Sequence, residues 1–339
     1  MANNYSAWSL SPNDFPSNEG LSSQIKFILQ FGILAPSTHN SQPWQLTLES
    51  ENRVVLRPDM NIASQLRQVD PQFRQLCISL GSFLSNTILA AECFGFSVDY
   101  EINAKTIAKA NVIMTFKKVG IFKHSKNLDA MMQRRSNKFA YREKVIPQKK
   151  LDIIKQKDVL VFSDLKSKEL LATLYRHSAS EFATKPFTEE LVSWMRPPHT
   201  NKHDGMPASV QGMKTAQFYI GRILMTRAPK LLEKVAASDY QKIANSSAIA
   251  IVSTKSDTIV DWIVAGKIME DFICNVVSEG IDVTIMQATI ESPANRKEIK
   301  ALLDGGFPQV FLRLGYSINK NAPHTPRKPI DSFIIGSWN

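Results

Sequence analysis

Two pairs of glycines with the same spacing place the strongest constraint on how this chain can fold. Gly81 and Gly95 lie fourteen positions apart, and so do Gly266 and Gly280. Aligning the two stretches pairs apolar residues with one another, namely Phe83 with Ile268, Leu84 with Met269, Ile88 with Ile273, Phe96 with Ile281 and Val98 with Val283. Each stretch therefore predicts a buried helix that ends at a glycine and leads into a strand. The match indicates a duplication, although any two buried helices with glycine caps would share such spacing.

A duplication predicts an α+β fold of two tandem halves that pack about a pseudo-twofold axis, like a homodimer joined in one chain. The composition turns Lys-rich and polar around 117–127, so we place an N-terminal half at 1–120 and a C-terminal half at 121–339. We expect mixed, mainly antiparallel sheets flanked by helices. Strands are expected near 44–48, 54–56, 96–116, 248–253 and 310–315, and long buried helices at 72–95 and 261–279.

The charge of the chain narrows its partners without identifying one. There are 41 Lys and Arg against 31 Asp and Glu, and this formal charge of +10 favours anionic ligands. The basic residues are spread along the chain rather than gathered on an aromatic-rich strand or a recognition helix, so we expect no nucleic-acid partner. A charged surface that keeps the protein soluble explains most of the excess of basic over acidic residues.

Cysteine usage and the lack of membrane signals predict a cytoplasmic protein. Cys77, Cys93 and Cys274 are scattered and form no CxxC pair, which fits a reducing compartment. The first twenty residues lack the pattern of a signal peptide, and no run of about 18 apolar residues is found, so we expect no membrane partner. His199 and His203 are four apart but lie in a proline-flanked loop, so we expect no metal site.

One short polar segment lies between two apolar elements. Residues 35–44 read APSTHNSQPW, with six hydrogen-bonding side chains from Ser37 to Gln42 between two prolines. The neighbouring helix and strand are expected to belong to the core, so polar groups held there need partners or cost roughly 1–3 kcal/mol each. A planar heterocycle with alternating donors and acceptors, such as the pyrimidine edge of a flavin, would satisfy them. The alternative is a surface loop whose Ser and Asn form turns.

A cluster of cations follows a helix predicted at 127–135. Residues 134–138 read RRSNK, which places three cations in five positions with Ser136 as a hydroxyl donor. This set suits a phosphate dianion. The alternative is that Arg and Lys at the C-terminus of a helix only complement its dipole.

Together the two segments resemble the motifs APSxxNxQPW and RRSxK/R of the FMN-dependent nitroreductase family. The resemblance implies that the first loop contacts the flavin and that the second motif grips the FMN phosphate. Gln42 and Trp44 are expected to fix the loop. The residues that the resemblance assigns to cofactor binding are Pro36, Ser37, Thr38 and Asn40 in the loop, and Arg134, Arg135, Ser136 and Lys138 in the cationic motif.

Two stretches near the C-terminus extend this resemblance. Residues 281–289 read IDVTIMQAT, and the resemblance implies that backbone N–H groups there face flavin N5, at Met286, Gln287 and Ala288. Residues 325–329 read TPRKP, and the resemblance implies that Arg327, with Lys328 as its neighbour, reaches the FMN phosphate.

More narrowly, the chain resembles the long fused (Acg-like) subgroup of that family over roughly residues 25–330. The likeness is carried by Asp70-Pro71 before the first buried helix, by Trp262 and Ala265-Gly266 in the second, and by LRLGY before the tail. Some members of the subgroup have a lid over the flavin. Residues 185–212, with four prolines and two glycines, are the candidate lid here, and a disordered excursion is the alternative.

The order of the two motifs departs from that of ordinary family members, in which RRS precedes the APS loop. Here the first half has only the APS loop and the second half has only RRS. An ordinary dimer builds two sites, each from the RRS of one subunit and the APS loop of the other. A fused pair that keeps one copy of each should bind one FMN per chain, as a monomer that mimics a dimer. Further pairing of chains stays open.

The resemblance implies an NAD(P)H-dependent oxidoreductase. Hydride would pass from NAD(P)H through flavin N5 to a nitroaromatic, quinone or similar small-molecule acceptor, and no side chain is expected to be catalytic because the flavin carries the chemistry. No GxGxxG follows a strand, so the nicotinamide is expected to visit only transiently. One alternative is a lidded flavin-binding protein with little turnover that serves FMN sequestration or storage. A third hypothesis is a basic nucleic-acid binder with a dead flavin fold.

Overall fold

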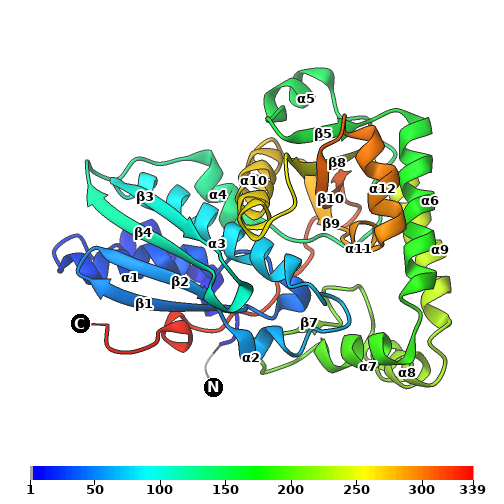
Figure 1. Cartoon of the computed structure of the whole chain (residues 1–339), viewed down its shortest axis with the longest axis horizontal. Helices are drawn as coiled ribbons and strands as arrows, with labels where there is room; N and C mark the ends of the chain where they lie inside the picture. Colours follow the sequence, from blue (N-terminus) through cyan, green and yellow to red (C-terminus); the bar gives the residue numbers. More distant parts are fainter. Residues whose placement is uncertain (1–2, 339) are drawn as a thin grey trace.

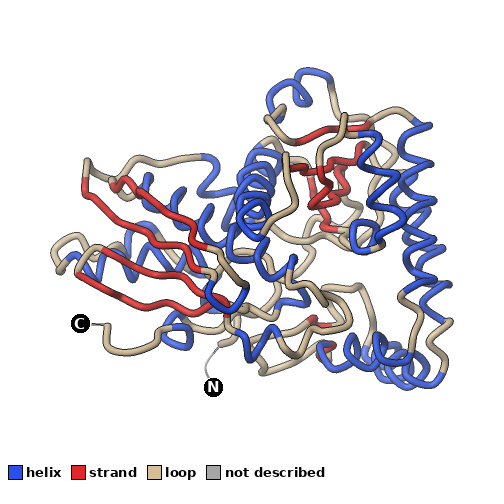
Figure 2. The backbone as a smooth tube through the Cα atoms, viewed as in Figure 1, coloured by secondary structure: helices blue, strands red, loops and turns tan. Residues whose placement is uncertain are grey.

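The computed structural model describes residues 3–338 and contains two four-stranded antiparallel sheets (Figures 1 and 2). The strands of the first sheet, in spatial order, are β1 (Trp44–Ser50), β2 (Arg53–Pro58), β4 (Asn111–Lys118) and β3 (Phe96–Asn103). The strands of the second sheet, also in spatial order, are β5 (Val159–Phe162), β8 (Ala248–Thr254), β10 (Phe307–Gly315) and β9 (Asp282–Ile285). The prediction of an α+β fold with mainly antiparallel sheets is confirmed.

Helices flank both sheets (Figure 1). Those beside the first sheet are α1 (Leu21–Gly32), α2 (Met60–Ala63), α3 (Arg74–Cys93) and α4 (Lys126–Gln133). Those beside the second are α5 (Gln148–Ile154), α6 (Leu165–Glu181), α9 (Leu231–Ala244), α10 (Ile259–Ser278), α11 (Ala288–Glu291) and α12 (Pro293–Leu302). Short 3-10 turns lie at Ser6–Ser9, Pro12–Asp14, Thr38–Asn40, Ile107–Lys109 and Ile330–Phe333.

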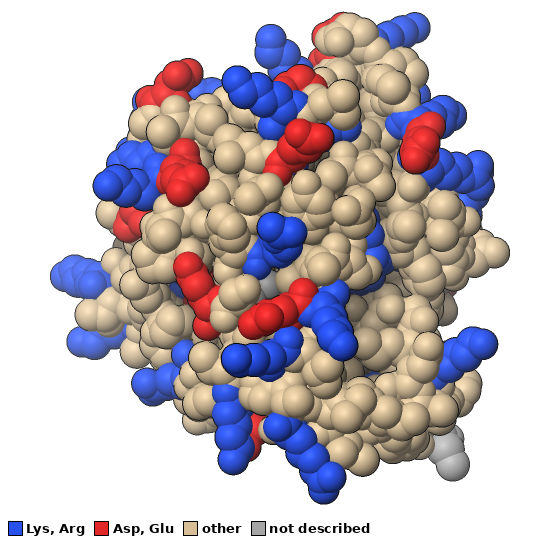
Figure 3. Space-filling view, turned by 90° about the vertical axis from the view of Figure 1, so that its right-hand side faces the viewer, with Lys and Arg blue, Asp and Glu red and all other residues tan. Residues whose placement is uncertain are grey.

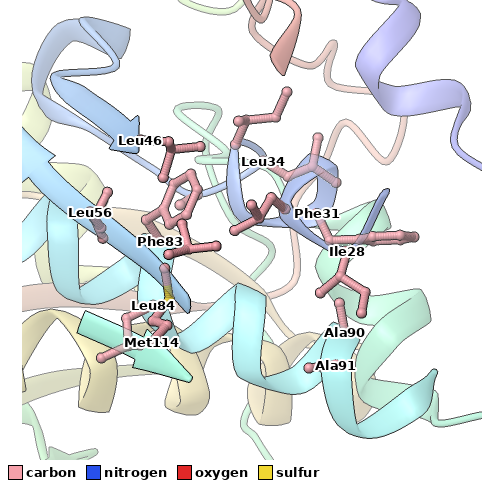
Figure 4. Packing of buried hydrophobic residues seen from close by; sticks show 14 of the residues in the cluster. Ile28, Phe31, Leu34, Leu46, Leu56, Phe83, Leu84, Ala90, Ala91 and Met114 are labelled. Carbon is pink, nitrogen blue, oxygen red and sulfur yellow. The ribbon is translucent and has the colours of Figure 1, made fainter. Parts of the chain in front are cut away.

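Apolar patterning explains how each sheet is covered. Every residue of β8 is buried, and alternate residues pack on opposite faces: Ala250 joins a cluster with residues of α10, whereas Ile251 joins one with residues of α6 and α9. In β4 buried and partly exposed residues alternate, so the first sheet packs one face against α1 and α3. Figure 4 shows that core, with side chains of the strands meeting those of the helices at Leu46, Leu56, Met114, Phe31 and Phe83.

The helices α3 and α10 cross between the two sheets and pack directly on each other (Figure 1). Two glycines permit this close approach. A Cβ added at Gly81 would lie 1.8 Å from the carbonyl oxygen of Ile263, and one added at Gly266 would lie 1.9 Å from that of Ile78. The contact is therefore between backbones, and any side chain at either glycine would force the helices apart.

The ends of these two helices bear out the glycine spacing. Gly95 follows α3 with a φ of 81°, and Gly280 follows α10 with a φ of 72°. Glycine adopts this left-handed conformation without a Cβ clash, so each helix stops and the chain turns into β3 or β9. Both predicted units of helix, glycine and strand are confirmed, whereas their origin by duplication stays a prediction.

Residues 182–230, between α6 and α9, form an excursion from the second sheet that includes the candidate lid at 185–212. It comprises α7 (Lys185–Trp194), β6 (Met195–Arg196), β7 (Met206–Pro207) and α8 (Thr215–Arg227), and the two short strands pair in parallel. The structure shows these elements rather than a disordered stretch. After the two short strands the chain continues into α8 and then into α9.

The C-terminal tail returns from the second sheet to the first. The Ile335 N–H donates to the Leu46 carbonyl oxygen at 2.8 Å, and Ile330 and Phe333 complete the core beneath the first sheet. Residues assigned to the C-terminal half therefore finish the N-terminal one. The division into 1–120 and 121–339 stays a prediction.

Among residues 3–338, α3 is the one helix long and apolar enough to cross a membrane, and 83% of its apolar window is buried inside the fold. Ser, Asn and Thr interrupt the helix, so it is not a run of about 18 apolar residues, although its mean hydropathy is high enough to pass this test. A central core helix, covered on all sides, can be as apolar as a membrane span.

Candidate functional site

A cavity of about 420 Å³ gathers segments that lie far apart in the sequence. This volume is typical of small-molecule sites. Its wall includes every residue predicted to bind the cofactor, namely Pro36, Ser37, Thr38, Asn40, Arg134, Arg135, Ser136, Lys138, Met286, Gln287, Ala288 and Arg327. The structure thus brings the APS loop, the cationic motif, the end of β9 and the tail to one place. Their role toward a flavin stays a prediction.

The backbone of the APS loop is strained. His39, Asn40 and Gln42 have φ values of 51°, 56° and 56°, a region that costs non-glycine residues of order 1–3 kcal/mol each. Gln42 holds the loop: its N–H donates to Ser37 Oγ at 2.9 Å and its side chain donates to the His203 carbonyl oxygen at 2.7 Å. The predicted fixing role of Gln42 is confirmed, and strain of this kind is concentrated at functional sites.

The side chain of Asn40 is fully engaged by protein. Its Nδ2 donates to the carbonyl oxygens of Gly205 and Pro326 at 3.1 and 2.9 Å, and its Oδ1 accepts from Arg327 Nη1 at 2.6 Å. Asn40 therefore ties the loop to the excursion and to the tail. Both amide protons are used, so the side chain of Asn40 has none left for a ligand in this arrangement.

Two arginines converge on the carbonyl oxygens that follow α1. Arg327 donates from Nε to Ile33 at 2.8 Å and from Nη2 to Leu34 and Ala35 at 3.0 and 3.2 Å. Arg134 donates from Nη2 to Leu34 at 2.5 Å. Carbonyl groups at the end of a helix lack helical partners and carry its negative pole, so cations are favoured there. Both arginines therefore fix the entry of the APS loop, a role that the cationic motif alone does not reveal.

Glu270 of α10 offsets this pair of cations. It is fully buried, and its Oε1 lies 3.1 Å from Arg134 Nε. Burial raises the pKa of Glu270, while burial and then the nearby Arg134 hold the pKa of Arg327 well below its usual range. We favour the ion pair because a guanidinium keeps its proton in proteins, so a neutral Glu270 would leave two buried cations uncompensated.

The other cationic residues present more of their donors to the cavity. Lys138 Nζ donates to the Ile285 carbonyl oxygen at 3.1 Å, and burial lowers the pKa of Lys138 to about 8, with Asp239 opposing the shift. Arg135 is half-buried and donates from Nη1 to the Lys320 carbonyl oxygen at 3.1 Å. A lysine desolvated in this way gains from any anion that enters the cavity.

The stretch after β9 presents backbone amides, although one of the three predicted donors is occupied. The Met286 N–H donates to the Phe311 carbonyl oxygen at 2.9 Å. The side chain of Gln287 donates to the Gln309 carbonyl oxygen at 2.7 Å, which fixes the turn. Ala288 begins α11, where N–H groups have no partner within the helix. Gln287 and Ala288 are therefore the better candidates for amide donors toward a ligand.

Two histidines of the wall have an unsatisfied ring nitrogen. Nε2 of His39 and Nε2 of His324 are buried without a hydrogen-bond partner among residues 3–338. Burial lowers the pKa of both to about 4, with a further contribution from Lys138 for His39 and from Arg135 for His324, so both rings are neutral at pH 7. Buried polar atoms without partners are costly, which indicates that a ligand or water completes them.

The excursion supplies the apolar part of the wall. Several of its residues, together with Leu232 and Val235 of α9, line the cavity, and four of them are methionines, Met195, Met206, Met213 and Met225. Glu190 anchors α7 beside the cavity by accepting the N–H groups of Gln68 and Val69 at 2.7 and 2.9 Å. Methionine fills irregular space and adapts to different apolar ligands. The cavity therefore joins a polar, cationic end to a flexible apolar one.

Sequence reasoning missed several wall residues. Trp8 of the N-terminal arm stacks on His324 with ring centroids 4.0 Å apart, and Gln75 of α3 accepts from Thr38 Oγ1 at 2.9 Å. Glu291 also lines the cavity and forms an ion pair with the buried Arg74. None of these lies in a motif. The only available signal was Asp70-Pro71 before α3, since Asp70 accepts the N–H groups that start that helix.

Comparison with known proteins gives two kinds of similarity. No family model matches the chain. Two Mycobacterium tuberculosis (strain H37Rv) proteins, “Putative NAD(P)H nitroreductase Rv3131” and “Uncharacterized protein Rv3127”, are each 22% identical over 328 residues, covering 91% of this chain and 90% and 92% of their own lengths. Among solved structures, the FMN-dependent nitroreductase NfnB from Mycobacterium smegmatis covers 62% of this chain and 98% of its own, with 12% identity and a TM-score of 0.40. The resemblance to nitroreductases predicted from the motifs is thus confirmed by a relative that matches nine tenths of this chain.

Proposed function

We propose that the chain is an FMN-dependent oxidoreductase that binds one FMN in this cavity and passes hydride from NAD(P)H to a nitroaromatic, quinone or similar acceptor. The observation that carries the proposal is the convergence of the APS loop with the RRSNK motif. These segments are almost a hundred residues apart, yet both line the same cavity. The name of the relative Rv3131 and the FMN dependence of NfnB support the same reading.

The cavity has the chemistry that FMN requires. A flavin combines a planar ring bearing donors and acceptors with a phosphate dianion. The unpartnered Nε2 atoms of His39 and His324 and the amides of Gln287 and Ala288 offer polar contacts for the ring. Arg135, Ser136 and Lys138 offer two cations and a hydroxyl for the phosphate or the ring.

When bound, FMN would supply the hydride acceptor and donor. The chain's own residues would bind and orient it. Lys138 and the amides of Gln287 and Ala288 would favour negative charge on the ring. The methionine wall would exclude water from the cavity.

We also infer one FMN per chain, with the chain as a monomer that mimics a dimer. Support comes from the single copy of each motif and from the matching topology of the two sheets. In each sheet the strand after the central helix lies at one edge and pairs with the next strand of the chain, β3 with β4 after α3 and β9 with β10 after α10. The free, buried state of all three cysteines supports a cytoplasmic location.

The test is the optical and redox behaviour of the purified chain. The expected result is a yellow protein with one FMN per chain, bleached rapidly under anaerobic conditions by NADH or NADPH and reoxidised by a quinone or nitroaromatic. A colourless protein that takes up no FMN would contradict the proposal. A ratio near two would contradict the single site.

The storage alternative has one observation in its favour. The excursion forms much of the cavity wall and is anchored by Glu190, which would restrict the access of a second substrate to the flavin face. The same anaerobic titration separates the two functions. A flavin that dithionite reduces but neither nucleotide touches would support sequestration.

A further inference from the structure

Helix α8 exposes an apolar face that nothing in the chain covers over residues 3–338. Phe218 and Met225 are buried on the inner side of the helix. On its outer side Tyr219, Ile220, Ile223 and Leu224 are 53%, 58%, 53% and 46% exposed. Their spacing of i, i+1, i+4 and i+5 places them on one face of the helix. Four large apolar side chains side by side form a patch, which single exposed hydrophobic residues do not.

Cations frame this patch. From 214 to 235 the chain has five basic residues, Lys214, Arg222, Arg227, Lys230 and Lys234, against a single acidic one, Glu233. Figure 3 shows the right-hand side of the molecule in Figure 1. Along the lower edge of this view, at the level of α7 and α8 in Figure 1, Lys and Arg outnumber Asp and Glu. An exposed apolar face between basic residues is the pattern of helices that lie in the interface of an anionic membrane.

We propose that the α8 surface, defined as Tyr219, Ile220, Ile223 and Leu224 with the basic residues around them, docks on a bilayer of anionic phospholipids. The apolar residues enter the boundary between headgroups and acyl chains. The Lys and Arg residues meet the negative headgroups. The fold decides which apolar residues stay exposed, so the sequence did not reveal this face and led us to expect no membrane partner.

A second copy of the chain fits this surface poorly. Both copies would bring the same excess of basic residues to the contact, five against one acidic residue over 214–235, so the net charges of the two surfaces would repel each other. Four apolar side chains are also small beside the roughly 1,000 Å² that a stable protein interface buries. Negative headgroups complement the same charges without requiring a large contact.

The surface also borders the cavity, and this link rests on the proposed function. Met225, on the inner side of α8, lines the cavity. Val235 of the neighbouring α9 lines it as well and is 49% exposed, so the cavity reaches the surface beside α8. Docking would therefore hold the apolar end of the cavity against the bilayer. The acceptor class that fits is an apolar quinone dissolved in lipid, rather than a water-soluble nitroaromatic.

Sedimentation of the full chain with large unilamellar vesicles tests the docking. Equal mixtures of phosphatidylglycerol and phosphatidylcholine should bind the chain, and pure phosphatidylcholine should not. The double variants I220E/I223E and R227E/K230E should each weaken binding at least about tenfold, and salt should weaken it in the wild type. Matched controls elsewhere on the surface, I121E for the apolar change and K149E/K157E for the charge change, should bind as the wild type does.

Two outcomes would overturn the proposal. One is the absence of binding to anionic vesicles, or binding that I220E/I223E leaves intact. The other is a wild-type dimer in light scattering that I220E/I223E converts to a monomer, which would make a second copy the occupant. Near-ultraviolet circular dichroism shows whether the variants are folded.

These readouts need neither flavin nor turnover. Vesicle binding by a chain that takes up no FMN would refute the proposed function and leave the docking in place. Full FMN occupancy without vesicle binding would refute the docking alone. If both hold, reduction of a long-chain quinone in vesicles should fall at least about tenfold in I220E/I223E while reduction of a water-soluble quinone does not change.

Discussion

Replacing Gly81 by alanine should separate the two central helices. The added Cβ would lie 1.8 Å from the carbonyl oxygen of Ile263, whereas ordinary contacts begin near 3.4 Å, so the backbones must move apart by about 1.5 Å. The three atoms nearest to the added Cβ all belong to the backbone of α10, so no side chain can rotate away to make room. A gap of even 0.5–1 Å forfeits a quarter to a half of the dispersion energy along an interface. We therefore expect a loss of about 3 kcal/mol or more in the free energy of unfolding, the upper end for overpacking.

Thermal or urea unfolding of the purified variant measures this loss. For 339 residues the unfolding entropy is about 0.7 kcal/mol per kelvin, so a loss of about 3 kcal/mol lowers the Tm by about 4 °C. Gly221→Ala is the matched control, because Gly221 lies inside α8 with nothing within 4 Å of its added Cβ, and alanine should stabilise that helix by about 1 kcal/mol. A Gly81→Ala stability within 1 kcal/mol of the wild type would refute the argument.

The remaining predictions concern charge and pH. Burial lowers the pKa of Lys138 to about 8, so most of its ammonium form is lost between pH 7 and pH 9. If this ammonium contacts FMN, the chain should bind FMN about tenfold more weakly at pH 9 than at pH 7 in fluorescence titrations. Lys138→Met should abolish the difference. Arg327→Lys should cost about 3 kcal/mol of stability and lower FMN content, since an ammonium cannot span three carbonyl groups. In the exposed control Arg53→Lys the loss should stay under about 0.5 kcal/mol, and equal losses in the two variants would contradict the clamp. Burial raises the pKa of Asp70 from 3.8 to about 7, so its contribution to unfolding free energy is complete below pH 3.8 and declines as pH rises to 7; the difference from Asp70→Asn should follow that window, and a constant difference would count against it.

Much of the fold could be predicted because the signals for helix ends and buried strands lie within the segments that they shape. The glycine after each central helix is needed where the chain turns, so Gly95 and Gly280 mark the ends of α3 and α10 in the sequence itself. Continuous burial of β8 likewise follows from its apolar run. The return of the tail could not be predicted, because the pairing of Ile335 with Leu46 joins residues almost three hundred positions apart and leaves no period in either segment.

The site was predictable as a set of residues but not as a set of contacts. The motifs identified segments that do line one cavity. They could not show that Asn40 and Arg327 bind each other, or that Arg134 faces the Leu34 carbonyl, because a cation looks the same in sequence whether it meets a ligand or the main chain. Trp8 and His324 were missed because two aromatic rings at opposite ends of the chain form no motif.

The arginine contacts connect assembly of the fold to assembly of the site. The carbonyl oxygens at Ile33, Leu34 and Ala35 lie where α1 passes into the strained APS loop, and the residue that binds all three is Arg327, near the end of the chain. The same tail segment accepts a hydrogen bond from Asn40 at Pro326. The tail contacts therefore add to the local bond from the Gln42 N–H to Ser37 Oγ in offsetting the cost of the left-handed residues of the loop. Docking of the tail and shaping of the cavity are consequently coupled through Arg327, whose donors bind the main chain after α1 and the side chains of Asn40 and Thr325.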